Sequence, residues 1–494
     1  MQELTRLAKI IHNNNPKVLP VVDLTDHVSL EGRLFQLIKS SSTLSDEEAC
    51  FKLYGEKKVT PNYRMLKSRL RKKLLNSLLF TELTEAHIRL SLLKHVECLV
   101  LIQQANKLAI LAEPFLAEKI VDQVISIAQK VELNDILAKA YEIKQYANLL
   151  SNSRSKFEKS SQKLQQYFLL DVKEREAQLI YNKLKFEINY NISNFRKQSK
   201  AYQESLPLIK NLWEVSGSSK IFDYYHMMRI AYRELSGDYE GVINDINEAE
   251  RLLAEGKLVD AWFNDRFNNY IRVYAYLRLG RLEEGLSYSK LYLNGFRESS
   301  SNWFAFLENY VTLALHNKEY DLAMQLWTLA VEKGAHEQPR PAAREIWGLI
   351  ENYVQLISHK ATKANENVSF QSQYETSVIS KDKEGLNFPL IVANYLEILP
   401  KLEVEGLEQY AERFGKYSSK YLKGDMGARA RLFVKLLLLS TKEEGERLKQ
   451  KSAPLLEKLK ATPPPRDPFA EVEIVPYEHL WDLVLELHQQ RAKQ

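Results

Sequence analysis

Residues 273–293 read VYAYLRLGRLEEGLSYSKLYL, two helix-like runs that meet at Gly280. Ala275 and Tyr276 come shortly before this glycine on the first run, and Gly285 follows it on the second. Glycine is common in the turn just past the end of a helix. The stretch therefore predicts two antiparallel helices joined by a short turn.

The same arrangement occurs on both sides of this stretch. Upstream, AYRELSGDYEGVINDINEAERLL at 231–253 carries Tyr239 after a glycine, and downstream LALHNKEYDLAMQLWTLAVEKG at 313–334 carries Tyr320. The matching positions Tyr239, Leu282 and Tyr320 are 43 and 38 residues apart. Helix-like runs at this spacing, with no room for a sheet between them, predict an all-α fold of stacked helical hairpins.

The turn resembles that of a tetratricopeptide repeat, in which a small and an aromatic residue precede the glycine and a second small residue lets the two helices approach closely. The family repeat has about 34 residues, so the longer spacing indicates longer helices or degenerate units. The resemblance implies a right-handed superhelix of stacked αα-hairpins over residues 81–360, with a protein partner in its concavity. Ordinary antiparallel helix pairs with small residues at their crossings are the alternative.

The composition is that of a folded protein, since 45% of the 494 residues are hydrophobic and 27% are charged. Two cysteines are too few for a disulfide framework, and no run of about 20 apolar residues is present to span a bilayer. The start, MQELTRLAKIIHNNNP, lacks the apolar core of a signal peptide. We therefore expect a cytoplasmic protein without membrane contact.

Recognisable catalytic motifs are missing from the sequence, which contains no GxxxxGK[ST] loop, no GxSxG elbow and no HExxH pair. His95 and Cys98 share one helix face in HVEC, but a zinc site needs three or four ligands. A buried cysteine beside a polar histidine is the simpler interpretation. We therefore expect a non-enzymatic scaffold that mediates protein interactions and holds no cofactor.

We expect five segments along the chain. Residues 1–80 should form a basic three-helix unit, and residues 81–360 the repeat array. A polar linker should follow at 361–384, and further helical hairpins at 385–462. Residues 463–494 should form a proline-rich segment and a last helix. Within the array, the run at 155–192 is long enough that we expect at least one break in it.

The last predicted helix carries an apolar stripe with helical i, i+3, i+4, i+7 spacing. Such a helix either caps the open end of a repeat array or docks on another protein. The stripe consists of Tyr477, Leu480, Trp481, Val484, Leu487 and His488.

The stretch NYRMLKSRLRKKLLNSLLF at 62–80 carries six basic side chains and no acidic one. We expect a helix with Thr60 as its N-cap, preceded by a helix that Ser45 and Glu48 cap reciprocally. All of the chain's excess charge of +5 lies in residues 1–90, so a charge-driven partner should bind there. The buried stripe of the basic helix should be Tyr63, Leu66, Leu70 and Leu74.

The phrase KLYGEKKVTPNYRMLKSRLRKKLL at 52–75 resembles the helix-turn-helix, winged-helix domains of some bacterial transcription regulators, through Tyr54, Gly55 and the run at 68–74. This resemblance implies a DNA-binding regulator whose repeats sense a signal or oligomerise. Two features depart from that family. The connection up to Thr60 has six residues, and TELTEAHIRLSLL after Phe80 has the pattern of a helix instead of a β-hairpin wing.

Three interpretations of the basic helix stay open: nucleic-acid binding through residues 57–73, contact with an acidic protein surface, or a solvated helix face. The candidate contacts are Arg64, Lys67, Arg69, Arg71, Lys72 and Lys73.

Polar residues on the repeat array supply a second set of candidates. Asparagine and arginine on an inner helix can bind a peptide backbone or carboxylate, and aromatic residues beside them lie either in a groove or in the core. The candidates for such a peptide groove are Asn268, Asn269, Arg272 and Tyr276.

Overall fold

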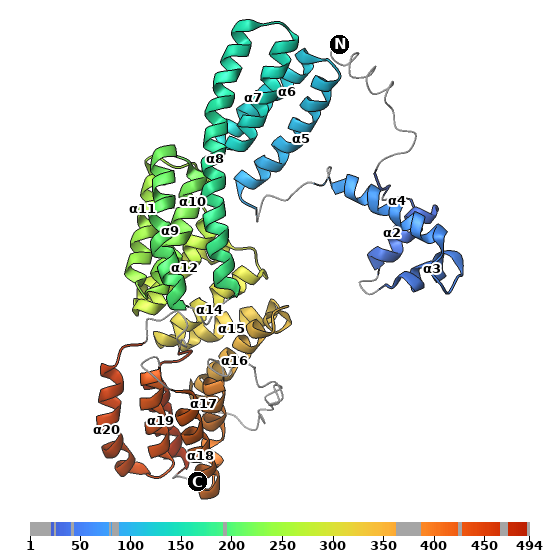
Figure 1. Cartoon of the computed structure of the whole chain (residues 1–494). Helices are drawn as coiled ribbons and strands as arrows, with labels where there is room; N and C mark the ends of the chain where they lie inside the picture. Colours follow the sequence, from blue (N-terminus) through green and yellow to red (C-terminus); the bar gives the residue numbers. More distant parts are fainter. Residues whose placement is uncertain are drawn as a thin grey trace. The chain divides into compact units, whose positions relative to one another are not determined.

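The computed structural model describes residues 21–23, 26–40, 44–78, 81, 88–190, 195–361, 387–422, 427–464 and 473–491. Over these residues the regular structure is helical throughout, with twenty α-helices and no strand, which confirms the all-α prediction. Consecutive helices pack in adjacent pairs, as expected of a helical-repeat fold (Figure 1). The expected linker at 361–384 lies, except for its first residue, outside the described residues.

The chain divides into two compact units, residues 1–171 and 172–494. The boundary falls inside α8 (Arg154–Tyr190), an unbroken helix of 37 residues. The break expected in this run is therefore wrong. Its physical reason is that residues 154–190 contain neither proline nor glycine, the two residues that interrupt helices most strongly.

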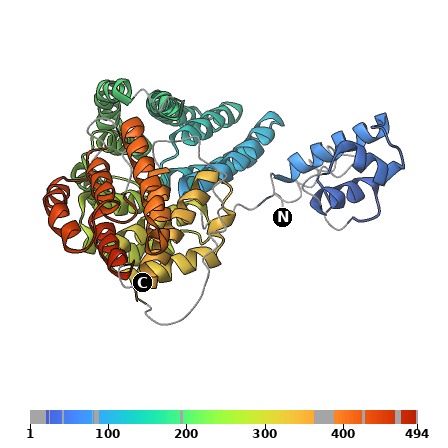
Figure 2. The ribbon, with the colours of Figure 1, turned by 90° about the horizontal axis from the view of Figure 1, so that it is seen from below.

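The first unit begins with a small three-helix core, formed by α2 (Leu30–Ser40), α3 (Asp46–Tyr54) and α4 (Pro61–Ser77) (Figure 2). The Cys50 side chain is fully buried in this core, together with apolar residues from all three helices. These residues are Leu34, Ala49, Leu53, Tyr63, Leu66 and Leu70, with Leu74 half-buried beside them.

The local signals at the helix ends of this core are confirmed. Ser45 and Glu48 form a capping box at the start of α3, and Thr60 caps α4 through a hydrogen bond from the Tyr63 amide. Gly55 ends α3 in the left-handed conformation, with φ of 74°. The connection between α3 and α4 therefore comprises the six residues 55–60, as the sequence indicates.

The rest of the first unit is an array of α5 (Leu90–Ile110), α6 (Pro114–Lys130), α7 (Asn134–Leu150) and the first part of α8. Helix α6 packs on both α5 and α7, and α5 also contacts α7 directly. Helices α5 and α7 thus lie side by side.

The second unit also consists of helices that pack in consecutive pairs. Its helices, after the second part of α8, are α9 (Phe195–Ser216), α10 (Ser219–Leu235), α11 (Tyr239–Ala254), α12 (Asp265–Leu279), α13 (Leu282–Tyr292), α14 (Ser301–His316), α15 (Tyr320–Glu332), α16 (Pro341–Ala361), α17 (Asn387–Ile398), α18 (Val404–Tyr421), α19 (Ala428–Ser440), α20 (Gly445–Ala461) and α21 (Tyr477–Arg491). Among the helices that the structure describes, none combines the length and apolar character needed to cross a bilayer.

One type of turn joins the hairpins of both units. In each case a residue in the left-handed conformation, with φ between 51° and 69°, follows the first helix. The amide of the next residue then donates a 2.9–3.0 Å hydrogen bond to the carbonyl five residues earlier, which is the Schellman geometry. The left-handed residues are Ala112, Glu132, Asn152, Gly237, Gly280 and Lys318.

Close packing of the hairpins depends on small residues. A Cβ atom on Gly285 of α13 would lie 2.9 Å from Cδ1 of Leu313 on α14 and 3.2 Å from Cβ of Tyr276 on α12. Helix α13 therefore packs tightly against its own hairpin partner and against the next hairpin.

The last helix, α21, buries the apolar stripe expected from its sequence in the chain's own core; only Leu487 of the stripe is half-buried. A buried ionic network joins α21 to α19. The Arg429 guanidinium lies 2.6 Å from Glu473 Oε1 and 2.7 Å from Glu478 Oε2, and it donates to the carbonyls of Leu459 and Thr462. One arginine of α19 thus ties α20, α21 and the segment between them together.

Candidate functional site

Helix α4 presents most of its basic side chains to solvent. Tyr63, Leu66 and Leu70 face the three-helix core, as predicted, and Leu74 is half-buried. The exposed cations are Arg64, Lys67, Arg69, Arg71 and Lys72, whereas Lys73 is half-buried.

Acidic residues of α2 and α3 neutralise half of these cations. The Lys67 ammonium lies 2.6 Å from Asp46 Oδ1, which also accepts a 3.0 Å hydrogen bond from the Tyr63 hydroxyl. These bonds lower the pKa of Asp46, while burial and the Asp46 carboxylate raise the pKa of Tyr63 to about 12. Glu31 of α2 lies 2.5 Å from the Lys73 ammonium and 3.5 Å from Arg69 Nε.

The remaining cations of α4 are Arg64, Arg71 and Lys72, which form no ion pair with the described residues. Arg64 and Arg71 are seven residues apart, so they lie on one face of the helix, two turns from each other. The structure therefore separates the six predicted contacts into three that pair with carboxylates of α2 and α3 and three that form no ion pair with the described residues.

The four candidates for a peptide groove lie on α12, and all of them are buried. Asn268 Oδ1 lies 2.9 Å from His226 Nε2 of α10, and Asn269 Oδ1 accepts a 2.7 Å hydrogen bond from the Tyr288 hydroxyl of α13. Burial lowers the pKa of His226 to about 4, so this imidazole is neutral at pH 7. Both asparagines therefore bridge neighbouring helices.

Arg272 and Tyr276 also make contacts inside the chain. Arg272 Nη2 lies 2.7 Å from Glu250 Oε2, and its guanidinium lies 5.2 Å from the ring centroid of Tyr288. The Arg281 guanidinium lies over the Tyr276 ring, 5.1 Å from the ring centroid. A peptide that used these four residues would have to compete with contacts that join α12 to its neighbours.

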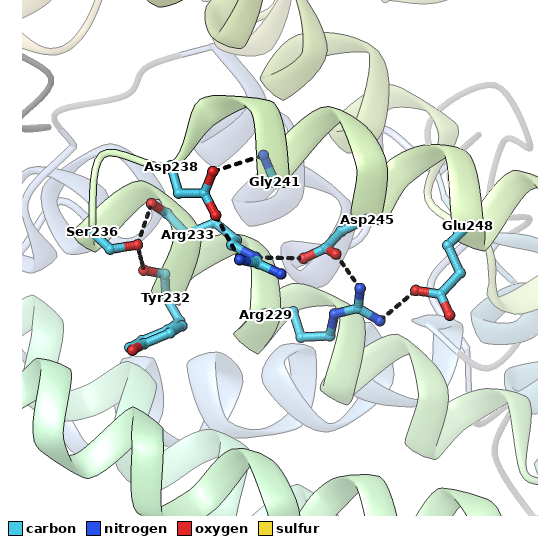
Figure 3. A network of polar contacts seen from close by, with 8 residues as sticks. All are labelled: Arg229, Tyr232, Arg233, Ser236, Asp238, Gly241, Asp245 and Glu248. Atoms are coloured by element: carbon cyan, nitrogen blue, oxygen red, sulfur yellow. Dashed lines mark hydrogen bonds and ion pairs between the residues drawn. The ribbon is translucent and has the colours of Figure 1, made fainter.

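A polar network, which sequence reasoning missed, crosses the hairpin of α10 and α11 (Figure 3). The Asp245 carboxylate, only 3% exposed, binds Arg229 and also accepts a 3.3 Å hydrogen bond from Arg233 Nε. Arg229 Nη1 reaches Glu248 at 2.8 Å, and Arg233 Nη1 reaches Asp238 at 2.5 Å. Each buried charge has a partner, so removal of one member would leave a buried charge uncompensated.

Helix α12 also carries a half-buried strip, defined here as Tyr270, Tyr274 and Arg278. Arg278 Nε donates a 2.9 Å hydrogen bond to the Tyr274 hydroxyl, and its guanidinium lies over the Tyr274 ring at 5.3 Å. The spacing i, i+4, i+8 keeps the three side chains on one face of the helix.

Two half-buried carboxylates accompany this strip, Glu234 of α10 and Glu308 of α14. Both act electrostatically on the Tyr270 hydroxyl, whose pKa is raised mainly by burial. Desolvation raises the pKa of each carboxyl to about 7. For Glu234, the positive charge of Arg278 partly opposes this rise. Among the described residues, no ion pair or hydrogen bond reaches the Glu308 carboxylate, so this desolvated charge is uncompensated.

A groove with a cavity volume of about 460 Å³ lies on the exposed face of α7, between α5 and the start of α8. Tyr146 and Leu149 of α7 line it and are 47% and 59% exposed. The buried residues Ile102 and Ile143 also line it, as do Lys139 and Glu142. The lining of this α7 groove therefore combines apolar and polar side chains, and the groove stays open to solvent.

His95 and Cys98 do not form a reactive site. His95 Nε2 lies 2.7 Å from Asp135 Oδ2, and the Cys98 thiol is fully buried. Burial raises the pKa of this thiol to about 11, so it is protonated at pH 7 and a poor nucleophile. Within the described ranges, no three acidic, histidine or cysteine side chains converge as metal ligands would.

Comparison with known proteins identifies no relative: no protein-family model matches the chain, and neither do any of the curated proteins or the solved structures.

Proposed function

We propose that the chain is a non-enzymatic helical-repeat scaffold that binds a protein partner in the α7 groove. The observation that supports this most directly is the exposure of Tyr146 and Leu149 beside an open cavity. Burying apolar surface contributes about 25 cal/mol per Å², so a partner that covers these side chains gains binding energy there. Tyrosine is also among the residues most often found at the centre of protein interfaces.

The lining of the groove favours a partner segment with apolar anchors. Ile102 and Ile143 would receive such anchors, while Lys139 and Glu142 offer one charge of each sign to polar groups of the partner. We also place this scaffold in the cytoplasm, because Cys50 and Cys98 are free thiols and reducing compartments keep thiols in that form.

Site-specific photocrosslinking tests the proposal. A photoreactive phenylalanine analogue at position 146 should crosslink one dominant protein in the native host, and Leu149→Glu in the same chain should abolish that product. The control carries the analogue at Tyr292, which is also partly exposed but lies on α13. A product at 146 that persists with Leu149→Glu, or that matches the product at 292, would exclude the α7 groove as the binding surface.

Nucleic-acid binding by α4 is the second candidate function. It is supported by Arg64, Arg71 and Lys72, whose charges face solvent on the three-helix core, as phosphate contacts require. The pairing of Lys67 with Asp46 and of Lys73 with Glu31 reduces the charge that a nucleic acid would meet.

A salt titration of binding to duplex DNA tests this second candidate. Each phosphate contact adds about 0.9 to the slope of log affinity against log salt, so three cations should give a slope near −3. Reversal of Arg64, Arg71 and Lys72 to Glu should remove the binding. Equal binding by the wild-type and reversed chains would exclude α4 as the contact.

A further inference from the structure

Helix α8 carries exposed apolar side chains on the side that faces away from the core of the second unit. Ala177 and Leu184 face this core and are buried with apolar residues of α9 and α10. Leu179 lies about 160° around the helix from Ala177 and about 140° from Leu184, at about 100° per residue. Val172, Leu179 and Phe186 are 46%, 71% and 62% exposed. We call these three residues the α8 stripe.

The α8 stripe has the spacing of a helix–helix contact. Its members are seven residues apart, which is close to two helical turns, so they form a nearly straight apolar row. Apolar residues that repeat every seven positions line the contact between two helices in a coiled coil. A row of this kind that stays exposed indicates a surface for another protein.

Two charged residues accompany the α8 stripe on one flank. Glu176 follows Val172 by four positions and Lys183 follows Leu179 by four, so both lie on the same side of the apolar row. Both side chains are exposed, and neither forms an ion pair with the residues that the structure describes. This flank therefore offers one carboxylate and one ammonium group, seven residues apart, to a partner.

A second copy of α8 matches this pattern when it runs antiparallel. With a twofold axis at Leu179, this side chain meets its own copy, and Val172 comes level with Phe186 of the partner subunit. The axis also brings equal flanks together, so Glu176 lies within about 1.5 Å, measured along the helix, of the level of Lys183 of the partner subunit. Because the axis repeats each contact, the pair gains two ion pairs and two apolar contacts beside the central one.

A parallel pair of α8 helices does not match the charges. It would place each residue level with its own copy and bring opposite flanks together, so Glu176 and Lys183 would not face each other. The order of the charges along α8 therefore favours the antiparallel pair.

We infer that the chain forms a homodimer in which two α8 helices pack antiparallel through the α8 stripe. Leu179 lies on the twofold axis, and Glu176 pairs with Lys183 of the partner subunit. All residues of this contact lie in the second unit. The inference goes beyond the proposed function, because neither Tyr146 nor Leu149 of the α7 groove takes part in the contact.

Sedimentation velocity of the full-length chain tests the homodimer. At micromolar concentrations the wild-type chain should sediment as a monomer–dimer equilibrium. Leu179→Glu brings two carboxylates together at the axis and should raise the Kd of the dimer by about tenfold or more. The matched control is Leu291→Glu on α13, which makes the same change at a leucine of similar exposure, 73%, and should leave the Kd unchanged. A wild-type chain that stays monomeric, or a dimer that Leu179→Glu leaves intact, would overturn the inference.

Charge reversal on the flank of α8 gives an independent test at exposed positions. Glu176→Lys alone should weaken the dimer, because it presents a like charge to Lys183 of the partner subunit at two places. Adding Lys183→Glu to the same chain should restore the wild-type Kd. A double variant that dimerises as weakly as the single variant would show that the two residues do not pair, and the antiparallel contact would then be wrong.

Cysteine crosslinking tests the orientation of the two helices. Leu179→Cys should give a disulfide-linked dimer under mild oxidation, because the two thiols meet at the axis. Val172→Cys should not, because about 20 Å along the helix separates this position from its copy in the antiparallel pair. The native thiols of Cys50 and Cys98 are buried, which protects them from oxidation. Equal crosslinking at positions 172 and 179 would indicate a parallel pair and contradict the inference.

Discussion

The uncompensated carboxylate of Glu308 makes a specific prediction about stability. Burial raises its pKa to about 7 in the folded chain, compared with the ordinary value of 4.5. A carboxyl with a raised folded-state pKa favours the folded state at pH values below the unfolded pKa, and this contribution is lost as the pH rises through the folded pKa. The chain should therefore lose stability between about pH 4.5 and pH 7 on account of this one group.

The magnitude follows from the shift. At 1.36 kcal/mol per pKa unit, the full penalty would be about 3 kcal/mol, and water that reaches the half-buried side chain should reduce it to about 1–2 kcal/mol. Glu308→Gln removes the charge at similar volume, so at pH 8 the variant should be more stable than wild type by that amount. At pH 5, where the wild-type side chain is largely protonated, most of the difference should disappear.

Thermal unfolding at pH 5 and pH 8 measures this difference, with an expected rise in Tm of about 2–4 °C for each kcal/mol. The control is Glu283→Gln, which makes the same chemical change at an exposed position of α13 and should change stability by less than about 0.5 kcal/mol at either pH. A variant that melts at a lower temperature than wild type at pH 8 would refute the reasoning, because it would mean that the Glu308 carboxylate has a stabilising partner.

Three further substitutions test the packing of the second unit. Asp245→Asn leaves Arg229 and Arg233 without their shared counter-charge and should cost about 3 kcal/mol in urea denaturation; no loss would mean that the network is solvated. Gly285→Val forces new atoms against Leu313 and should cost about 1–3 kcal/mol by the same assay, whereas an unchanged value would contradict the close approach of α13 and α14. Arg429→Gln breaks the buried contacts of α19 with α21, and limited proteolysis should then cleave after residue 462 sooner than in wild type; an unchanged cleavage rate would argue against this role.

Helix ends could be predicted where the residues themselves enforce the conformation. Gly237 and Gly280 stand at left-handed turn positions that the sequence marks clearly. Ala112, Glu132 and Lys318 occupy the same backbone conformation although none of them is a glycine. At these positions the packing of the hairpins outweighs a local conformational cost of about 1 kcal/mol per residue. The repeat is therefore more regular in the structure than its sequence suggests.

For the candidate sites, the sequence shows which residue types are present but not which of them are paired or buried. Six cations on α4 were evident, yet which of them are neutralised depends on Asp46 and Glu31, which lie on other helices. The chemistry of Asn268 and Asn269 makes them candidates for peptide binding, but the sequence does not show that both side chains are buried. Glu308 lies within the aromatic stretch NWFAFLENY, but only the fold shows that no cation of the described chain accompanies it.

The shared hairpin turn has an evolutionary consequence. In the first unit the left-handed residues Ala112, Glu132 and Asn152 follow one another at intervals of 20 residues, and each turn closes through a backbone hydrogen bond of its own. A duplicated gene segment of two such intervals would encode a complete hairpin, turns included, without needing any matching change elsewhere in the chain. An insertion or deletion of two such intervals would therefore change the length of the first unit by one whole hairpin and leave the remaining turns intact.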